Sequence, residues 1–175
     1  MSKKWIGVLV GIWIIAAICG TTYFNLVKKD KGIKTIAANG LTREEKPKEK
    51  VVIYIPGADG KSLIKKDGEI EQSQSRKDKS VKVVAKTIEI LQNEGFIESK
   101  DITVLNLYFS GDTAYIDLNS QAKEMDDNSR KNLLNIYSIV NSLTELGNIS
   151  RVKILVNGKD GSKNLDKFYN RNTSI

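Results

Sequence analysis

An uncharged stretch of 23 residues, Trp5–Val27, limits what the amino-terminal part of this chain can become. As an α-helix it would be about 34 Å long, enough to cross a hydrocarbon core of about 30 Å. Only a helix satisfies its own backbone hydrogen bonds in lipid. Lysines bracket the stretch, and Trp5, Tyr23 and Phe24 are suited to the membrane interfaces. We therefore expect a transmembrane helix within residues 1–27, preceded by a short basic tail.

Two alternatives apply to the same stretch. A signal peptide cleaved after a small residue would use Ala17-Ile18-Cys19, although its apolar region is usually only about 7–15 residues. A lipoprotein would need a small residue before Cys19, where Ile18 stands. The lysines after the stretch favour a cytoplasmic carboxyl-terminal side, whereas a short basic start is typical of an export signal. We expect a retained anchor in the cell membrane, with the rest of the chain on the extracytoplasmic side.

The remaining chain divides by composition into three segments. Residues 28–49 are polar, carry mixed charges and lack a hydrophobic period, which is typical of a linker. Residues 50–160 alternate apolar runs with turn signals, as expected of one folded domain. Residues 161–175 are polar, and we expect a frayed carboxyl-terminal tail.

The net charge of +7 is not spread evenly over the chain. Residues 1–50 hold ten Lys or Arg and four Asp or Glu, whereas residues 51–175 hold eighteen and seventeen. The folded domain is therefore nearly neutral. Because nucleic-acid binding needs a basic face on the folded module, we expect no nucleic-acid partner.

The chain has no histidine, and its one cysteine, Cys19, lies in the hydrophobic stretch. Zinc sites built on His and Cys, and triads that use His as the base, are therefore excluded. No phosphate-binding or dinucleotide-binding glycine motif is present, so we expect no cofactor. The Asp-Gly pairs lack the spacing of a calcium loop and are explained by turns.

The hydrophobic pattern predicts strands and helices in a mixed order. Apolar β-branched or aromatic runs predict strands, whereas apolar residues at helical spacing predict two helices, the second capped by Ser129. A hairpin turn is expected at Asp67-Gly68. The strands are expected at residues 51–55, 102–109, 113–118 and 152–156, and the helices at 78–94 and 129–146.

This order suits an α/β (α+β) fold of two layers. We expect a sandwich in which two helices pack on one sheet of about four to five strands. A domain of this size buries roughly two-thirds of its unfolded surface, so it needs no metal or disulfide.

The segment Ile139–Lys159, IVNSLTELGNISRVKILVNGK, closely resembles the carboxyl-terminal signature of the GerMN domain family. The opening run Val52–Pro56 and the hairpin Gly111–Leu118 are similar to the family pattern too, so the resemblance spans about residues 50–160. The protein for which the family is named has tandem copies, whereas this chain has room for one. Residues 95–101 also lack the Gly-Pro character of the family.

The resemblance implies an exported, membrane-tethered domain with a fold akin to ring-building motifs of secretion-like assemblies. It also implies a non-catalytic role in an envelope or sporulation-related assembly, with a protein partner or self-association. A tethered binder of a cell-wall polymer or small ligand is the alternative. We expect no enzyme activity.

Three residues are candidates for an interaction surface: Asn141 and Thr144, from the segment that resembles the family signature, and Tyr54 of the first strand. Local hydrogen bonds or solvent exposure would also explain Asn141 and Thr144. A hydrolase that uses carboxylates alone is a third, weaker possibility. Its candidate acids cluster around the second hairpin and are Asp112, Asp117, Glu124, Asp126 and Asp127.

Overall fold

The computed structural model describes residues 47–175. The anchor expected within residues 1–27, and the linker at 28–49 except for its last three residues, lie outside the described residues. Among those that are described, no helix is long and apolar enough to cross a bilayer.

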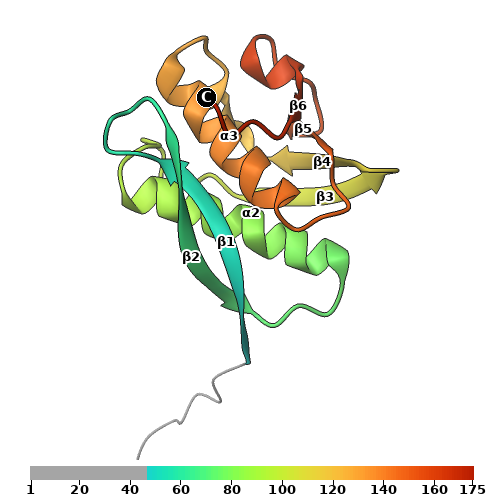
Figure 1. Ribbon diagram of the computed structural model, residues 1–175. Helices are drawn as coiled ribbons and strands as arrows, with labels where there is room; N and C mark the ends of the chain where they lie inside the picture. The colour runs from blue at the N-terminus through green and yellow to red at the C-terminus, as the bar shows by residue number, and fades with distance from the viewer. Residues whose placement is uncertain (1–46) are drawn as a thin grey trace, which may run out of the picture. The chain divides into compact units, whose positions relative to one another are not determined.

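The domain contains two sheets and two α-helices (Figure 1). The elements are β1 (Lys48–Pro56), β2 (Leu63–Glu71), α2 (Arg76–Asn93), β3 (Val104–Ser110), β4 (Thr113–Leu118), the 3₁₀ turn η1 (Ser120–Met125), α3 (Arg130–Thr144), β5 (Arg151–Val156), the 3₁₀ turn η2 (Asn164–Asp166) and β6 (Phe168–Asn170). Strands β1 and β2 form an antiparallel ribbon, and the second sheet has the order β3-β4-β5-β6. In the second sheet only β4 and β5 are parallel.

The α/β class is confirmed, but the prediction of two layers with one sheet is wrong. The helices lie between the two sheets, so the domain has three layers (Figure 1). Helix α2 is buried on two sides: Val84 and Ile88 belong to the main core, whereas Val83 and Ile90 pack with the ribbon. An amphipathic pattern alone does not show that a helix has a second apolar side.

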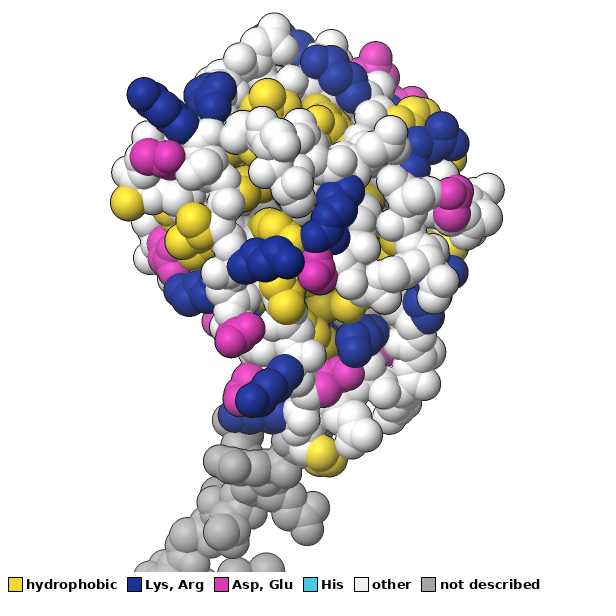
Figure 2. Space-filling model, viewed as in Figure 1, with side chains coloured by type: hydrophobic (Ala, Val, Ile, Leu, Met, Phe, Trp, Pro, Cys, Tyr) yellow, Lys and Arg dark blue, Asp and Glu magenta, His cyan; other side chains and the backbone are white. Residues whose placement is uncertain are grey.

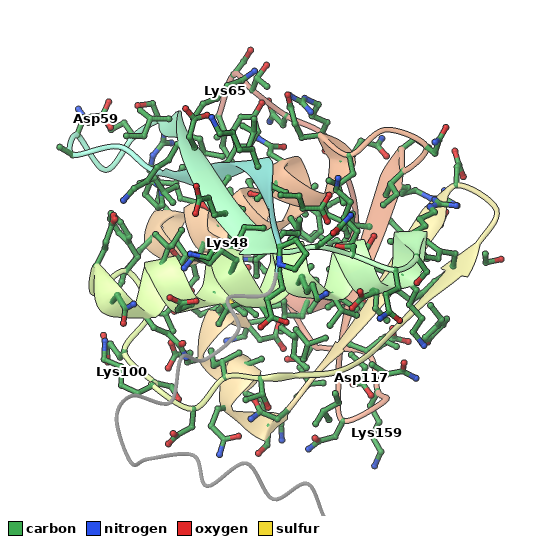
Figure 3. The ribbon with its side chains drawn as sticks, turned by 90° about the horizontal axis from the view of Figure 1, so that it is seen from below. Lys48, Asp59, Lys65, Lys100, Asp117 and Lys159 are labelled. Carbon is green, nitrogen blue, oxygen red and sulfur yellow. The ribbon has the colours of Figure 1, made fainter. Side chains whose placement is uncertain are left out.

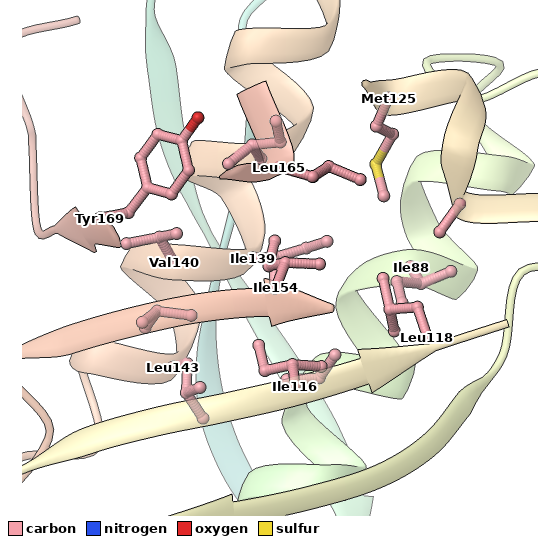
Figure 4. Close-up of a cluster of buried hydrophobic side chains, with 14 of the residues drawn as sticks. Ile88, Ile116, Leu118, Met125, Ile139, Val140, Leu143, Ile154, Leu165 and Tyr169 are labelled. Carbon is pink, nitrogen blue, oxygen red and sulfur yellow. The ribbon is translucent and has the colours of Figure 1, made fainter. Parts of the chain in front are cut away.

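The main core lies between the helices and the four-stranded sheet (Figure 4). Alternate residues of β4 and β5 point into it. It includes Ile88, Ile116, Leu118, Met125, Ile139, Val140, Leu143, Ile154, Leu165 and Tyr169. A smaller core of Val51, Ile53, Ile55, Ile70, Val83 and Ile90 joins the ribbon to α2.

The prediction of a hairpin turn at Asp67-Gly68 is also wrong. Strand β2 runs straight through both residues, because Val51 and Val52 of β1 pair with them along the ribbon. The turn lies instead between Gly57 and Ser62, whose backbone groups are hydrogen-bonded over 2.8 Å. Gly68 serves packing: a Cβ there would lie 3.0 Å from the Ile53 side chain.

The carboxyl-terminal segment is not a frayed tail. Strand β6 pairs with β5, and both Leu165 and Tyr169 are buried in the main core. Gly161 allows this path, since a Cβ there would lie only 2.4 Å from Leu165 Cβ. Two buried side chains separated by polar residues give no regular apolar period, so the sequence pattern did not reveal them.

Candidate interaction surface

The three candidate contact residues come together, but inside the domain. Tyr54, Asn141 and Thr144 are all buried in the described domain, so none of the three offers an exposed contact surface there. The Thr144 hydroxyl donates to the Val140 carbonyl at 2.9 Å. The Asn141 side chain holds the backbone of Asn172, accepting from its N–H at 3.0 Å and donating to its carbonyl at 2.6 Å.

Tyr54 is the centre of a polar cluster that ties β1 to α3 and to the carboxyl-terminal segment. The Tyr54 hydroxyl donates to Glu145 Oε2 at 2.8 Å. The Arg171 guanidinium donates to the Tyr54 hydroxyl oxygen and to Glu145 Oε2. The backbone N–H of Tyr54 donates to the Ser142 hydroxyl at 2.8 Å. The sequence signal at Asn141 and Thr144 therefore marks internal packing.

Partial burial shifts the pKa values of this cluster in opposite directions. Burial and the hydrogen bond to Glu145 raise the pKa of Tyr54. Burial alone would raise the pKa of Glu145 too, but hydrogen bonds from Arg171 and Tyr54 outweigh it and lower the pKa. Glu145 is therefore a stable anion next to a neutral phenol, which is a structural pairing and not a proton-transfer pair.

The candidate acids of the hydrolase hypothesis are each committed to a separate contact. Asp117 accepts from the Gly158 N–H at 2.7 Å, and it lies beside the turn that carries Lys159 (Figure 3). Glu124 accepts from the N–H groups of Glu98 and Ser99. The other three carboxylates, of Asp112, Asp126 and Asp127, bond to residues of the loop before β5, the loop before β6 and the start of α3.

These contacts hold loops in place, and they lower the pKa values of two of the carboxylates, Asp126 and Asp127. Burial would raise the pKa of Asp126, but the backbone N–H groups of Ser162, Leu165 and Lys163 outweigh it and lower the pKa. Hydrogen bonds from Ser129 lower the pKa of Asp127. A general acid needs a raised pKa, so neither group is suited to that role. Within residues 47–175, no three His, Cys, Asp or Glu side chains form a group that could hold a metal ion.

The surface formed by β1, β2 and α3 carries no single-sign patch. Basic and acidic side chains are interspersed over it (Figure 2). Several are paired across elements: Lys65 with Glu145, Lys66 with Glu94, and Lys79 with Glu49. Such exposed pairs contribute little to stability, and this face offers no focused field for a charged ligand.

A different surface is built on the side of the four-stranded sheet that faces away from the helices, here called the open face. The strand registers place four residues in one row across it: Tyr108, Tyr115, Lys153 and Phe168. The rings of Tyr108 and Tyr115 stack with centroids 5.1 Å apart, and Phe168 meets Tyr115 edge-on at 6.1 Å. This aromatic row joins three of the four strands.

Lys153 fills the gap in the row without giving it a free charge. Its side chain is 5% exposed, and its ammonium lies 2.9 Å from Asp160 and 3.5 Å from Asp166. The ammonium also lies over the Phe168 ring. The buried cation is thus neutralised by two carboxylates, and the row is apolar in character.

The open face carries large apolar side chains that contact water. Leu105 is 53% exposed, Phe168 49% and Tyr108 43%. Tyr108 and Phe168 belong to the row, Leu105 lies at the bulge of β3, and the fourth large exposed hydrophobic residue of the described chain, Ile64, lies on β2. Clustered exposed apolar residues mark interaction sites more often than scattered ones do. The sequence analysis missed this surface, although the alternation in 113–118 gave the outward position of Tyr115.

The chain is similar to known proteins in sequence pattern and in structure. A family model described as "Germane: Sporulation and spore germination" matches residues 52–162. No curated protein matches the chain. The tandem GerMN domains of the sporulation protein GerM from Bacillus subtilis are similar in structure, with a TM-score of 0.53 and 18% identity over 81% of this chain and 50% of that chain.

Two further solved structures are similar at lower scores. The first GerMN domain of the same Bacillus subtilis protein has a TM-score of 0.46 and 18% identity, covering 63% of this chain and 84% of that chain. A putative lipoprotein from Clostridium perfringens has a TM-score of 0.36 and 18% identity, covering 76% and 91%. This chain spans half the length of the tandem structure, and the likeness to it shows a shared fold. Because the family model covers well over half of its residues, the chain belongs to the Germane family of sporulation and spore germination.

Proposed function

We propose that this protein is a non-catalytic interaction module of a sporulation-related envelope assembly, tethered by residues 5–27 with its domain on the extracytoplasmic side. Family membership supports the sporulation context. The length and flanking residues of the hydrophobic stretch support the tether. The observation that carries the proposal is the aromatic row on the open face.

The row supports binding because it exposes apolar surface that the domain does not use for its own packing. Aromatic residues and arginine are enriched at the positions that contribute most of the binding energy of protein interfaces. Here Arg151 stacks on Phe168 with the guanidinium carbon 4.8 Å from the ring centroid. The carboxylates that a hydrolase would need are occupied by backbone N–H groups instead. A protein surface is therefore the occupant that the open face fits best.

Crosslinking in intact cells tests this proposal. The wild-type protein should yield a crosslinked species larger than the monomer. The variant Phe168→Ser should lose most of it, because it removes the exposed apolar end of the row. Ile64→Ser is the matched control, since Ile64 has the same 49% exposure but lies on β2. Equal crosslinking by both variants, at equal protein levels, would contradict the open face as the interaction surface.

A wall polymer is the second candidate occupant. The open face combines stacked rings with polar groups, such as Asn106 and Asp117 of the neighbouring row, and ligand sites often join apolar surface to a few polar groups. A ligand that binds only the native state raises its melting temperature. A saturable shift of the full chain with purified wall fragments, abolished by Phe168→Ser, would favour the polymer. Absence of any shift at millimolar fragment would exclude it.

A further inference from the structure

The edge strands of the two sheets differ in how they are protected against pairing with another strand. Exposed edges are usually blunted by charges, by short length or by a covering element. Strand β2 carries five charged residues, and β6 has only three residues. Strand β1 starts with Lys48, Glu49 and Lys50, and α3 covers its edge through the bond from the Tyr54 N–H to Ser142.

Strand β3 has none of these features over its seven residues, VLNLYFS. It contains no charged residue and no proline, and Val104, Tyr108 and Phe109 have high β-propensity. A bulge between Val104 and Asn106 is its one irregularity, and residues 106–110 are regular. Among the edge strands of the described domain, β3 is the only one longer than three residues that contains no charged residue.

The register identifies which backbone groups of β3 lie at its free edge. Ser110 pairs with Thr113 across a two-residue turn, so Ser110, Tyr108 and Asn106 direct their backbone groups to β4. The N–H and C=O groups of Leu107 and Phe109 then point to the free edge. Outside helices and sheet ladders, residues 47–175 contain no backbone hydrogen bond to either residue.

One side chain partly shields this edge. Asn106 Oδ1 accepts from the Leu107 N–H at 2.9 Å, and the Lys77 ammonium donates to the same oxygen at 2.9 Å. Asn106 and Lys77 are both exposed, so their contacts are open to competition from a strand. Phe109 packs against the main core and carries the guanidinium of Arg76 over its ring at 4.0 Å.

We propose that β3 pairs antiparallel with β3 of a second copy of this chain, centred on Tyr108. This inference deepens the proposed function, on which it rests, by naming the partner. Pairing about Tyr108 aligns residues 106–110 with the same residues of the copy and joins Leu107 to Phe109 by backbone hydrogen bonds. It also extends the aromatic row, because Tyr108 of each copy meets the other on the open face.

The composition of the strand allows a second copy as the occupant. In an isologous interface residue i of one copy contacts residue j of the other, and j contacts i. The paired residues 106–110 carry no charge, so the two strands themselves bring no like charges together. Lys77 lies at the Asn106 end, which pairs with the Ser110 end of the copy. The two Lys77 positions are then offset by about 13 Å along the strand, whereas Arg76, which lies over Phe109, comes near the Leu107 end of the copy.

Site-specific disulfide formation in intact cells tests the pairing. In a Cys19→Ser chain, Tyr108→Cys should give a disulfide-linked dimer on oxidation, because Cα atoms of a non-hydrogen-bonded antiparallel pair lie about 4.5 Å apart. Tyr115→Cys is the control, because residue 115 lies on the same face as residue 108. Any association through residues 1–46 would be the same in both variants, but the proposed pairing would leave the two copies of residue 115 about 14 Å apart. A dimer from Tyr108→Cys alone supports the pairing. No dimer, or equal dimer from both, overturns it.

Charge reversal at the same position separates lost pairing from lost folding. Two differently tagged full-length copies should co-purify from detergent extracts as wild type. Co-purification should be lost when both copies carry Tyr108→Lys or both carry Tyr108→Glu. It should return when one copy carries Tyr108→Lys and the other carries Tyr108→Glu. Failure of the mixed pair overturns the proposal. Both tests can give the overturning result while Phe168→Ser still loses the crosslink in cells and Ile64→Ser still keeps it. The pairing of β3 is then wrong, and the proposed function is still supported.

Discussion

Asp126 shows how single side chains hold the loops of this domain. Its carboxylate accepts from the backbone N–H groups of Ser162, Lys163 and Leu165 at 2.7, 2.9 and 3.0 Å. This contact places η2 and directs Leu165 into the core. The partners lie 36 to 39 residues away in sequence, so local pattern could not identify the role of Asp126. The sequence did not show what the carboxylates around the second hairpin bind.

Replacing Asp126 by alanine should destabilise the protein by about 1–3 kcal/mol, because three N–H groups lose a charged acceptor. Denaturant unfolding measures this, with Asp67→Ala on exposed β2 as the control. An equal change in both variants would contradict the anchoring role.

The lowered pKa of Asp126 also predicts a pH dependence. A carboxyl whose pKa is lower in the folded state stabilises it at pH values above its unfolded pKa of about 3.9. That stabilisation is lost as the pH falls through the lowered folded pKa. The free energy of unfolding of the wild type should therefore fall more steeply than that of Asp126→Ala as the pH is lowered from about 5 to about 3, roughly one unit either side of 3.9. Parallel pH curves would contradict this expectation.

At the scale of elements, the sequence predicted most of the secondary structure but not its layering. The helices were expected within about two residues of α2 and α3, and the strands close to β1, β3, β4 and β5. Long-range pairing decided the rest. Strand β1 holds β2 straight through Asp67-Gly68, and β5 captures β6. Local turn preference loses to these contacts because they bury apolar residues such as Ile70 and Tyr169.

Strand β6 offers an internal comparison between a core and a surface aromatic. Tyr169 is buried, packs edge-on against Tyr137 at 5.2 Å, and donates to the Asn164 carbonyl at 2.7 Å. Tyr169→Ala should cost about 3–5 kcal/mol. Phe168→Ala, on the opposite face of the same strand, should cost less than about 1.5 kcal/mol. Thermal unfolding of both variants measures the difference, and similar small losses would mean that the carboxyl-terminal strand adds little to the fold.

At the scale of the whole molecule, charge, burial and exposed apolar surface separate into different regions. The positive surplus lies in residues 1–50, whereas the domain is nearly neutral. Several acidic side chains of the described domain hold loops or pair with lysine, and the exposed rings of Tyr108 and Phe168 lie on the open face. This separation supports the proposed module that acts through contact.

Complementation of a strain that lacks this protein tests that claim most directly. One variant carries Tyr108→Ser with Phe168→Ser on the open face. The other carries Asp117→Asn with Glu124→Gln, which removes two candidate acids while keeping acceptor oxygens for their N–H partners. At equal protein levels, the account predicts that the open-face variant fails to restore spore formation and that the carboxylate variant succeeds. Failure of the carboxylate variant together with success of the open-face variant would contradict it.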